Sequence, residues 1–374
     1  MRIRHSLLIT AIALSSGATT LHAQDFAPRT GNGVFVMTND ASSNEVVAFE
    51  RDRTGVLRQT HSYRTGGRGS GGTIDPLTSQ GSLTLSTDGH WLFAVNAGSG
   101  TLSVFRVDGT RLFLTQEIST EGSEPNAVAQ HGDLVYVLNT AASSNVVGYR
   151  FVFGRLRPIS DSLRLLTANN IGSASIAFSP DGTTLTVTER ASNSFDVFGV
   201  QADGRLSLLT NTPSAVPGAF AATYAPNGTL LSSETGSGAP NSSTITSYAV
   251  QPDRTLSAIT TLPTLGAANC WNVVTPNGKF VYVSNSATSS ISGFAIQANG
   301  VLLPIEQTVV GNNPAGSANL DIAVSSDGAY LYTLNAASGT VGVFEIDASK
   351  GTLKNLGTTG DLPGGAGLNG IAAN

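Results

Sequence analysis

The sequence predicts an all-β protein, a single seven-bladed β-propeller with four-stranded blades. Three observations predict it: a block of short strands recurs along the chain, its copies lie 43 to 57 residues apart, and seven copies are present. Each block reads as a strand, an Asp-Gly or Asn-Gly turn, a second strand ending in Asn or Glu, a polar turn, and a third strand ending in Phe or Tyr. Repeats of about 40–50 residues with several short strands are typical of propeller blades.

The clearest copies span residues 83–105, 176–198, 273–294 and 322–344. Their strands alternate Val, Leu, Phe, Tyr and Thr with polar residues, which is the period of a half-buried strand. Asp-Gly and Asn-Gly between two such runs form tight hairpins, because both residues tolerate positive φ. The residues that end the second strands mark the seven blades in chain order: Asn39, Asn96, Asn139, Glu189, Glu234, Asn285 and Asn335.

Residues 1–23 resemble a secretory signal. Arg2 and Arg4 supply a basic start, an apolar run of about ten residues follows, and Ala23 offers a small residue for cleavage. The run is too short to span a bilayer as an anchor. We therefore expect residues 24–374 to form the propeller, without a membrane anchor, in the periplasm or as a secreted protein.

The two ends of the chain predict how the ring closes. Residues 33–39 occupy a second-strand position with no inner strand before them, and residues 367–374 match the start of the inner strand at 319–328. The C-terminal strand is therefore expected to supply the inner strand of the first blade, which removes an open edge. Fourth strands are weaker and more polar, as outer strands that face water can be.

Blade geometry divides the residues between two faces. The start of each inner strand and the end of each second strand lie on one rim, together with the connections between blades. We call this rim the loop face. The Asp-Gly hairpins lie on the opposite rim. A ligand is therefore expected on the loop face.

Composition and motifs exclude several functions. The formal net charge is −5 and only 12% of residues are charged, whereas nucleic-acid binding requires a basic stripe. The chain has no GxxxxGK[ST] loop, no GxSxG elbow and no His/Cys/Asp/Glu cluster at metal-ligand spacing. We expect no metal and no cofactor. Cys270 is the only cysteine, so no internal disulfide can form.

Two departures from the repeat suggest a site. Five blades end the second strand in Asn, which can cap the following turn, but neighbouring blades four and five carry Glu189 and Glu234. Such a pair could act as a base and its partner, because the charge of one raises the pKa of the other. Arg190 adjoins Glu189 as an ion partner or a substrate contact. The alternative is that both acids are structural.

The segment 65–81 and the sequence Asn-Cys-Trp-Asn at 269–272 supply further candidates. The segment is long and glycine-rich, so its backbone N–H groups could cradle an anion, with Arg68 adding charge. Trp271 could stack on a ring substrate, while Cys270 lines the channel and Asn272 lies beside it. The alternatives are a flexible surface loop for 65–81 and ordinary packing for Cys270, Trp271 and Asn272.

The blades, as in residues 179–189 and 325–344, resemble those of the seven-bladed lactonase family, which includes 6-phosphogluconolactonases and carboxymuconate-cyclizing enzymes. The resemblance implies a hydrolase or cyclase that acts on a small, anionic, oxygen-rich lactone. Glu189 matches the family's glutamate at a second-strand end and would be the base. Glu234 would be its partner, and Arg68 would contact the carboxylate or oxyanion.

A non-catalytic propeller is the alternative. Family members commonly begin inner strands with Pro-Arg-His or Pro-His, whereas the corresponding starts here contain neither His nor Arg: SQGSL, SEPNAV, GSASI, GAFAA, ANCWN and SANLDI. Such a protein would bind a small ligand or a protein partner through the same loop face.

Overall fold

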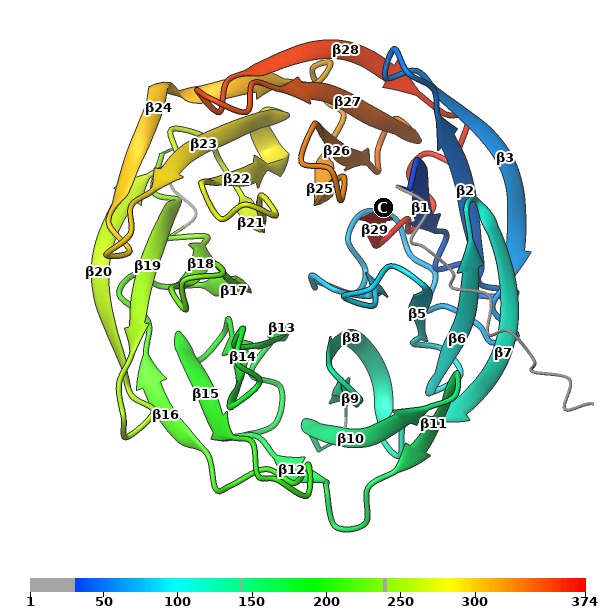
Figure 1. The fold of residues 1–374 in the computed structure, drawn as a ribbon, viewed down its shortest axis with the longest axis vertical. Coiled ribbons are helices and arrows are strands. Elements are labelled where there is room, and N and C mark those ends of the chain that lie inside the picture. Colours follow the sequence, from blue (N-terminus) through cyan, green and yellow to red (C-terminus); the bar gives the residue numbers. More distant parts are fainter. Residues whose placement is uncertain (1–30, 142, 238–240) are drawn as a thin grey trace, which may run out of the picture.

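The computed structural model describes residues 31–141, 143–237 and 241–374. Within them, strands form seven sheets arranged as blades around a central axis, and the only helical element is a 3₁₀ turn at Ser286–Thr288 (Figure 1). The predicted all-β, seven-bladed propeller is confirmed. The predicted signal at 1–23 lies outside the described residues. None of the described helical segments is long and apolar enough to cross a membrane.

The strands run from the axis outward in each blade. Blade one contains β29 (Ile371–Ala373), β1 (Gly33–Met37), β2 (Glu45–Arg51) and β3 (Leu57–Arg64). Blade two contains β4 (Leu83–Leu85), β5 (Trp91–Asn96), β6 (Thr101–Asp108) and β7 (Arg111–Ser119). Blade three contains β8 (Ser123–His131), β9 (Leu134–Ala141), β10 (Asn145–Val152) and a divided outer strand, β11 (Arg155–Pro158) and β12 (Arg164–Leu165).

The other four blades follow the same order. Blade four contains β13 (Ser173–Phe178), β14 (Thr184–Glu189), β15 (Ser194–Gly199) and β16 (Thr210–Pro213). Blade five contains β17 (Ala219–Tyr224), β18 (Leu230–Glu234), β19 (Thr244–Val250) and β20 (Leu256–Pro263). Blade six contains β21 (Asn269–Val274), β22 (Phe280–Asn285), β23 (Ser290–Ile296) and β24 (Leu302–Asn312). Blade seven contains β25 (Asn319–Val324), β26 (Tyr330–Asn335), β27 (Thr340–Ile346) and β28 (Leu353–Thr359).

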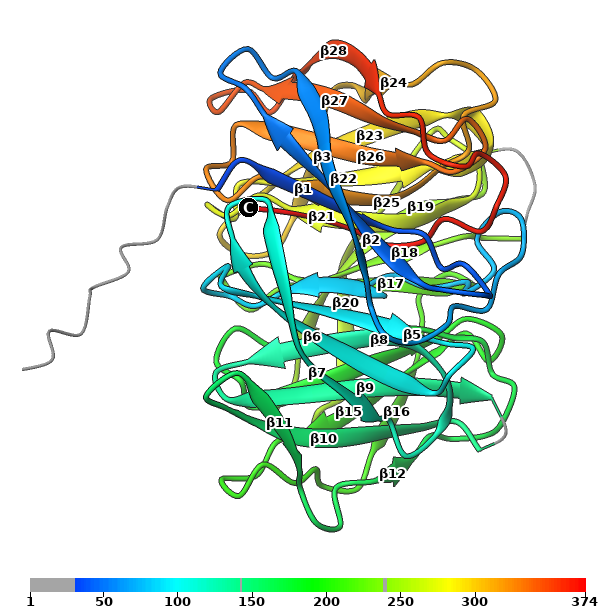
Figure 2. The ribbon, with the colours of Figure 1, turned by 90° about the vertical axis from the view of Figure 1, so that its right-hand side faces the viewer.

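The C-terminal strand closes the ring, as predicted. β29 pairs antiparallel with β1, with Val36 opposite Ile371. Met37 N donates to Gly370 O at 3.1 Å, which continues the pairing beyond the strand. Figure 2 shows β1 and the C-terminus side by side in blade one.

The repeated aromatic residue at the end of each third strand forms the core between blades. All seven are at most 1% exposed: Phe49, Phe105, Tyr149, Phe198, Tyr248, Phe294 and Phe344. Burying such a side chain contributes about 1.5–3 kcal/mol. The residues that reveal the repeat in the sequence are therefore the ones that hold neighbouring blades together.

Inner strands begin with a β-bulge in blades three to seven, next to the Asn or Glu that ends the second strand. A bulge leaves an unpaired residue on one strand and redirects its side chain. The residues left unpaired lie at the loop-face ends of the inner strands: Asn126, Ala174, Phe220, Cys270, Leu320 and Asp321.

The segment 65–81, which we call the strap, leaves blade one and reaches toward the axis of the ring before β4 begins (Figure 1). Gln80 N donates to Ala174 O of blade four at 2.9 Å. Ser79 Oγ donates to Asn126 O of blade three at 2.8 Å. The strap is thus bonded to blades that are distant from it in the sequence.

Candidate functional site

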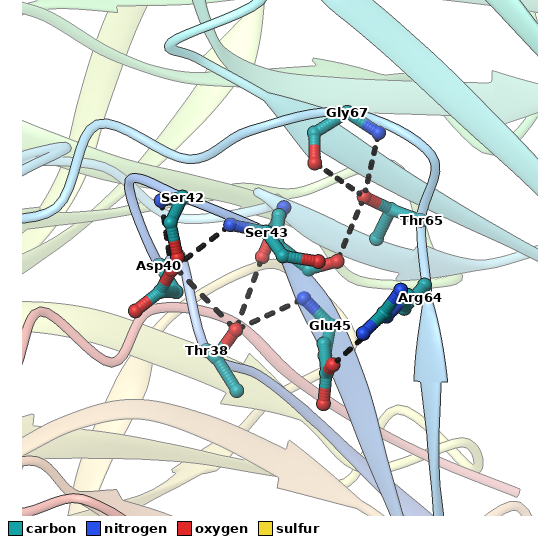
Figure 3. Close-up of polar contacts among 9 residues, drawn as sticks. Thr38, Asp40, Ser42, Ser43, Glu45, Arg64, Thr65 and Gly67 are labelled. Carbon is teal, nitrogen blue, oxygen red and sulfur yellow. Dashed lines mark hydrogen bonds and ion pairs between the residues drawn. The ribbon is translucent and has the colours of Figure 1, made fainter.

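The first residues of the strap, which we call its root, are bound to the turn between β1 and β2, the first turn of the loop face (Figure 3). Asp40 Oδ1 accepts a hydrogen bond from Ser42 N at 2.8 Å, which closes the turn. Thr65 Oγ1 donates to Asn44 O at 3.0 Å and accepts from Gly67 N at 3.2 Å. This network holds the strap against blade one where the two separate.

The glycine-rich part of the strap uses its backbone donors within the protein. Gly69 N and Gly71 N donate to backbone carbonyls of the first turn at 2.8 and 2.9 Å, and Ser70 N donates to Asn39 Oδ1 at 3.0 Å. These groups are therefore not open to an anion in this conformation. Arg68 is exposed beside blade two, where its Nη2 donates weakly to a carbonyl at 3.5 Å. Its contact with a substrate stays a prediction.

Further along the strap, Asp75 enters a group of polar residues at the axis. We call Asp75, Arg190, Cys270, Asp321 and Asn369 the axial cluster. Asp75 is half-buried, and Asn369 Nδ2 donates to its Oδ1 at 3.2 Å. Burial raises the pKa of Asp75 to about 7, although hydrogen bonds from Asn369 and Ser79 and the charge of Arg190 act in the opposite direction.

Asp321 and Cys270 form the buried side of the cluster. Asp321 is 3% exposed, and its carboxyl group accepts hydrogen bonds from Ile322 N at 3.0 Å and Ile371 N at 3.3 Å. Burial raises the pKa of Asp321 to about 7, and the charge of Asp75 acts in the same direction. Burial also raises the pKa of the Cys270 thiol, and the charge of Asp75 adds to this. Cys270 therefore stays protonated and is a poor nucleophile.

Arg190 is exposed and forms the open side of the cluster. Its guanidinium lies 6.0 Å from the ring centroid of Phe220, and its charge lowers the pKa of both Asp75 and Cys270 relative to burial alone. Among the described residues, no ion pair joins Arg190 to Glu189. Among the same residues no ion pair joins Arg190 to Asp75 either, so the charge of Arg190 acts on Asp75 from a longer distance.

Glu189 lies inside blade four and has no exposed surface. Its Oε2 accepts hydrogen bonds from Ser192 Oγ at 2.8 Å and Ser194 Oγ at 2.9 Å, and its Oε1 lies 3.4 Å from Thr167 N, which also donates to Asp196. Burial, together with the hydrogen bond and charge of Asp196, raises the pKa of Glu189 to about 7.

Glu234 takes the equivalent position in blade five and is also fully buried. It accepts hydrogen bonds from the hydroxyls of Thr246 at 2.6 Å, Thr244 at 3.0 Å, and Tyr248. Burial raises the pKa of Glu234, whereas the hydrogen bonds from these hydroxyl groups act to lower it. In blade two, Asn96 occupies this position and donates to third-strand hydroxyls instead.

The two glutamates therefore have separate partners, each within its own blade. In the described part of the chain, no hydrogen bond joins Glu189 to Glu234. Because neither carboxyl group is exposed, a role as a base requires the surrounding turns to open. Their catalytic role stays a prediction.

Trp271 and Asn272 support the strap from blade six. Trp271 is 1% exposed, packs edge-to-face on Phe220 with centroids 5.1 Å apart, and donates from Nε1 to Ser79 O at 2.8 Å. Asn272 is fully buried, and its backbone N and O both bond to the side chain of Gln80. Ligand contacts by Cys270, Trp271 and Asn272 stay predictions.

Sequence reasoning missed Asp75, Asp321 and Gln80. Asp75 and Gln80 lie in the segment 65–81, which stands out in the sequence for its glycines and Arg68 instead. Asp321 carries a signal that could have been used, because it is an acid at the start of an inner strand, SANLDI, that is otherwise small or apolar.

Two open cavities of about 500 and 590 Å³ lie on the opposite rim, away from the axial cluster. The smaller holds Arg51, whose guanidinium already pairs with Asp327 at 3.0 Å and stacks over Tyr330 at 4.2 Å. The larger holds Arg254 and Asp181 among turn residues. Charges of both signs line each cavity, so neither selects a ligand of one sign.

Comparison with known proteins agrees with this architecture. The family model described as lactonase, seven-bladed β-propeller, matches residues 26–164, 153–271 and 241–367. No curated protein matches the sequence. A structure from Bacteroides uniformis, described as a candidate 6-phosphogluconolactonase, is 21% identical, with a TM-score of 0.70 over 92% of this chain and 99% of that one.

Two further structures are similar in fold. The periplasmic gluconolactonase PpgL of Pseudomonas aeruginosa is 20% identical, with a TM-score of 0.66 over 90% of this chain and 98% of that one. A second candidate 6-phosphogluconolactonase, from Bacteroides fragilis, is 18% identical, with a TM-score of 0.63 over 91% and 98%. With its matched segments covering nearly the whole chain, this protein belongs to the seven-bladed β-propeller lactonase family.

Proposed function

We propose that the protein hydrolyses a small, oxygen-rich lactone at the axial cluster on its loop face. One observation carries the proposal: Asp75 is half-buried, has a pKa raised to about 7, and lies within the electrostatic influence of the exposed Arg190. A carboxyl group with that pKa is about half ionised at neutral pH, which suits a general base. Arginine suits a carboxylate or a developing oxyanion.

In the proposed reaction, Asp75 removes a proton from water while the water oxygen attacks the lactone carbonyl carbon. Arg190 stabilises the oxyanion that forms on the carbonyl oxygen. The ring C–O bond then breaks, and Asp75 returns its proton to the departing ring oxygen. The product is an open-chain hydroxy acid.

The expected substrate is a neutral or carboxylated sugar lactone without phosphate. A single exposed arginine in the cluster can meet one negative charge, whereas a phosphate dianion usually requires several donors. The similar PpgL is described as a periplasmic gluconolactonase. Together with the signal predicted at residues 1–23, this supports export, which cell fractionation and N-terminal sequencing of the mature protein would test.

A binding function is the second candidate. The inner-strand starts lack His and Arg, and Glu189 and Glu234 are buried. A propeller that has lost turnover would still hold a lactone or its hydroxy acid at Arg190. Calorimetric titration that shows binding without hydrolysis would favour this candidate.

The decisive experiment is a hydrolysis screen with gluconolactone, galactonolactone and a carboxylated lactone, corrected for the spontaneous rate. Loss of the general base in Asp75→Asn should lower kcat by about 100-fold or more. Asp361→Asn is the matched control, because Asp361 is an exposed acid in a connection of the same face. Wild-type protein with no rate above buffer, or full activity in Asp75→Asn, would contradict the proposal.

A further inference from the structure

The strap ends in a two-point clamp. The side chain of Gln80 accepts a hydrogen bond at Oε1 from Asn272 N at 2.9 Å and donates from Nε2 to Asn272 O at 3.0 Å. Gln80 Nε2 also lies 3.4 Å from Thr223 Oγ1 of blade five. One side chain therefore connects the strap to blades five and six, across the axis from its root on blade one.

The strap backbone is strained between its two anchored ends. Asp75 and Thr78 have φ of 47° and 48°, in the left-handed region. This region is unfavourable for residues other than glycine, and most of all for a β-branched residue such as Thr78. Such a conformation persists only where the surroundings fix it. The bonds of Ser79 and Gln80 to blades three, four and six supply that restraint directly after Thr78.

We propose that Gln80 is a positioning residue, which holds Asp75 in the axial cluster and the strap against Cys270 by clamping the strap to blade six. The catalytic part of this inference rests on the proposed function, whereas the covering of Cys270 does not. Gln80 bonds the backbone of Asn272, and Ser79 bonds the side chain of Trp271, the two residues that follow Cys270.

The chain contains a matched control for this clamp. Gln116 makes the same pair of bonds with the backbone of Leu156, accepting from N at 2.7 Å and donating to O at 3.1 Å. It is likewise half-buried, but it lies on β7 and joins the outer strands of blades two and three. Gln116→Ala therefore removes an equivalent clamp far from the axis.

The first measurement uses Cys270, the only cysteine of the chain and 8% exposed, as an internal probe. The rate of thiol modification at pH 8 should rise at least tenfold in Gln80→Ala and stay near the wild-type rate in Gln116→Ala. Gln80→Glu is the conservative variant. The carboxyl group that it introduces can both donate to and accept from Asn272 only while it is protonated, so the modification rate relative to wild type should increase as the pH rises.

The second measurement is the pH profile of hydrolysis. Release of the strap hydrates Asp75 and lowers its pKa, so the acid limb of the profile should move from about pH 7 toward lower pH. The change in kcat should be larger than the change in KM. A merely structural role would leave this limb in place. If no lactone is hydrolysed, the proposed function fails while the thiol measurement still tests the clamp. Equal thiol modification rates in Gln80→Ala and wild type, or equal effects of Gln80→Ala and Gln116→Ala, would overturn the inference.

Discussion

Glu189 and Asp196 share one hydrogen-bond donor inside blade four, where neither residue is exposed: Thr167 N lies 3.4 Å from Glu189 Oε1 and 2.9 Å from Asp196 Oδ2. Two carboxyl groups that share a donor repel each other when both are ionised, so a state in which one of them holds a proton is favoured. Thr167 Oγ1 and Asn211 Nδ2 also donate to Asp196 Oδ1, at 2.6 and 2.8 Å. Burial and the neighbouring Asp196 raise the pKa of Glu189 to about 7, which favours the protonated form of Glu189.

This pair predicts that stability falls as the pH rises. The pKa of Glu189 is raised from 4.5 to about 7, so its contribution is fully present below pH 4.5 and is lost as the pH passes 7. Asp75 and Asp321 act in the same direction. In urea unfolding between pH 5 and 8, we expect Glu189 alone to account for a loss on the order of 1–3 kcal/mol.

Glu189→Gln isolates that contribution. The amide of Gln can donate to Asp196 without first binding a proton from solvent, so the variant should be at least as stable as the parent at pH 8. The gain should shrink toward pH 5, where Glu189 is already neutral. A variant that is less stable than the parent at both pH values, with an unchanged slope, would contradict this account.

Tyr248 and Tyr282 allow a comparison of hydrogen bonds to a carboxylate and to a carbonyl. Tyr248 donates to Glu234, and Tyr282 donates to Gly351 O at 2.8 Å; both side chains are at most 1% exposed. Tyr248→Phe should cost about 1.5–3 kcal/mol at pH 8, against about 0.5–1.5 kcal/mol for Tyr282→Phe. Loss of the donor raises the pKa of Glu234 further, so the cost of Tyr248→Phe should be smaller at pH 5. Equal costs in chemical denaturation at both pH values would show that Glu234 is not ionised.

The fold could be predicted because the repeat residues are also its core. Phe294 ends a third strand and is buried between blades, and Asn285 ends a second strand and bonds to Ser290 and Ser292. Closure was predictable as well, because residues 367–374 read as the missing inner strand. Each inference needed only local pattern and period.

The axial cluster could not be predicted in the same way. Gln80 and Asn272 are 192 residues apart, and no local pattern predicts that the strap crosses the axis to meet blade six. The sequence also shows that Glu189 and Glu234 are acids, but not that hydroxyl groups on the next strand enclose them. Burial of a charged group depends on packing between strands, which period and composition do not determine.

Metal removal should leave the protein unchanged. Residues 31–141, 143–237 and 241–374 hold no group of three or more His, Cys, Asp or Glu side chains that could bind a metal ion. We therefore expect EDTA to alter neither the melting temperature nor hydrolysis. Elemental analysis that finds one tightly held ion per chain would contradict this, and backbone carbonyls near the axis would then be the first ligands to test.

Removal of residues 366–374 should open the ring and damage the axial cluster together. The deletion takes away β29 and the buried Leu368 and Ile371, so β1 loses its inner neighbour. The loss of this apolar burial should lower the free energy of unfolding by about 3–6 kcal/mol. It also removes Asn369, which bonds Asp75, and the N–H of Ile371, which bonds Asp321. Urea unfolding should therefore show a large loss of stability, and lactone hydrolysis should fall with it.

Phe153→Ala is the control for that deletion, because this side chain is 97% exposed at a hairpin tip and its removal should cost almost nothing. A synthetic peptide of residues 366–374 supplies a sharper test. If the C-terminal strand acts by pairing with β1, the free peptide should bind the truncated protein and raise its melting temperature in a concentration-dependent way. A scrambled peptide should not. Truncated protein that melts within a degree or two of the parent would show that the ring is held closed without β29.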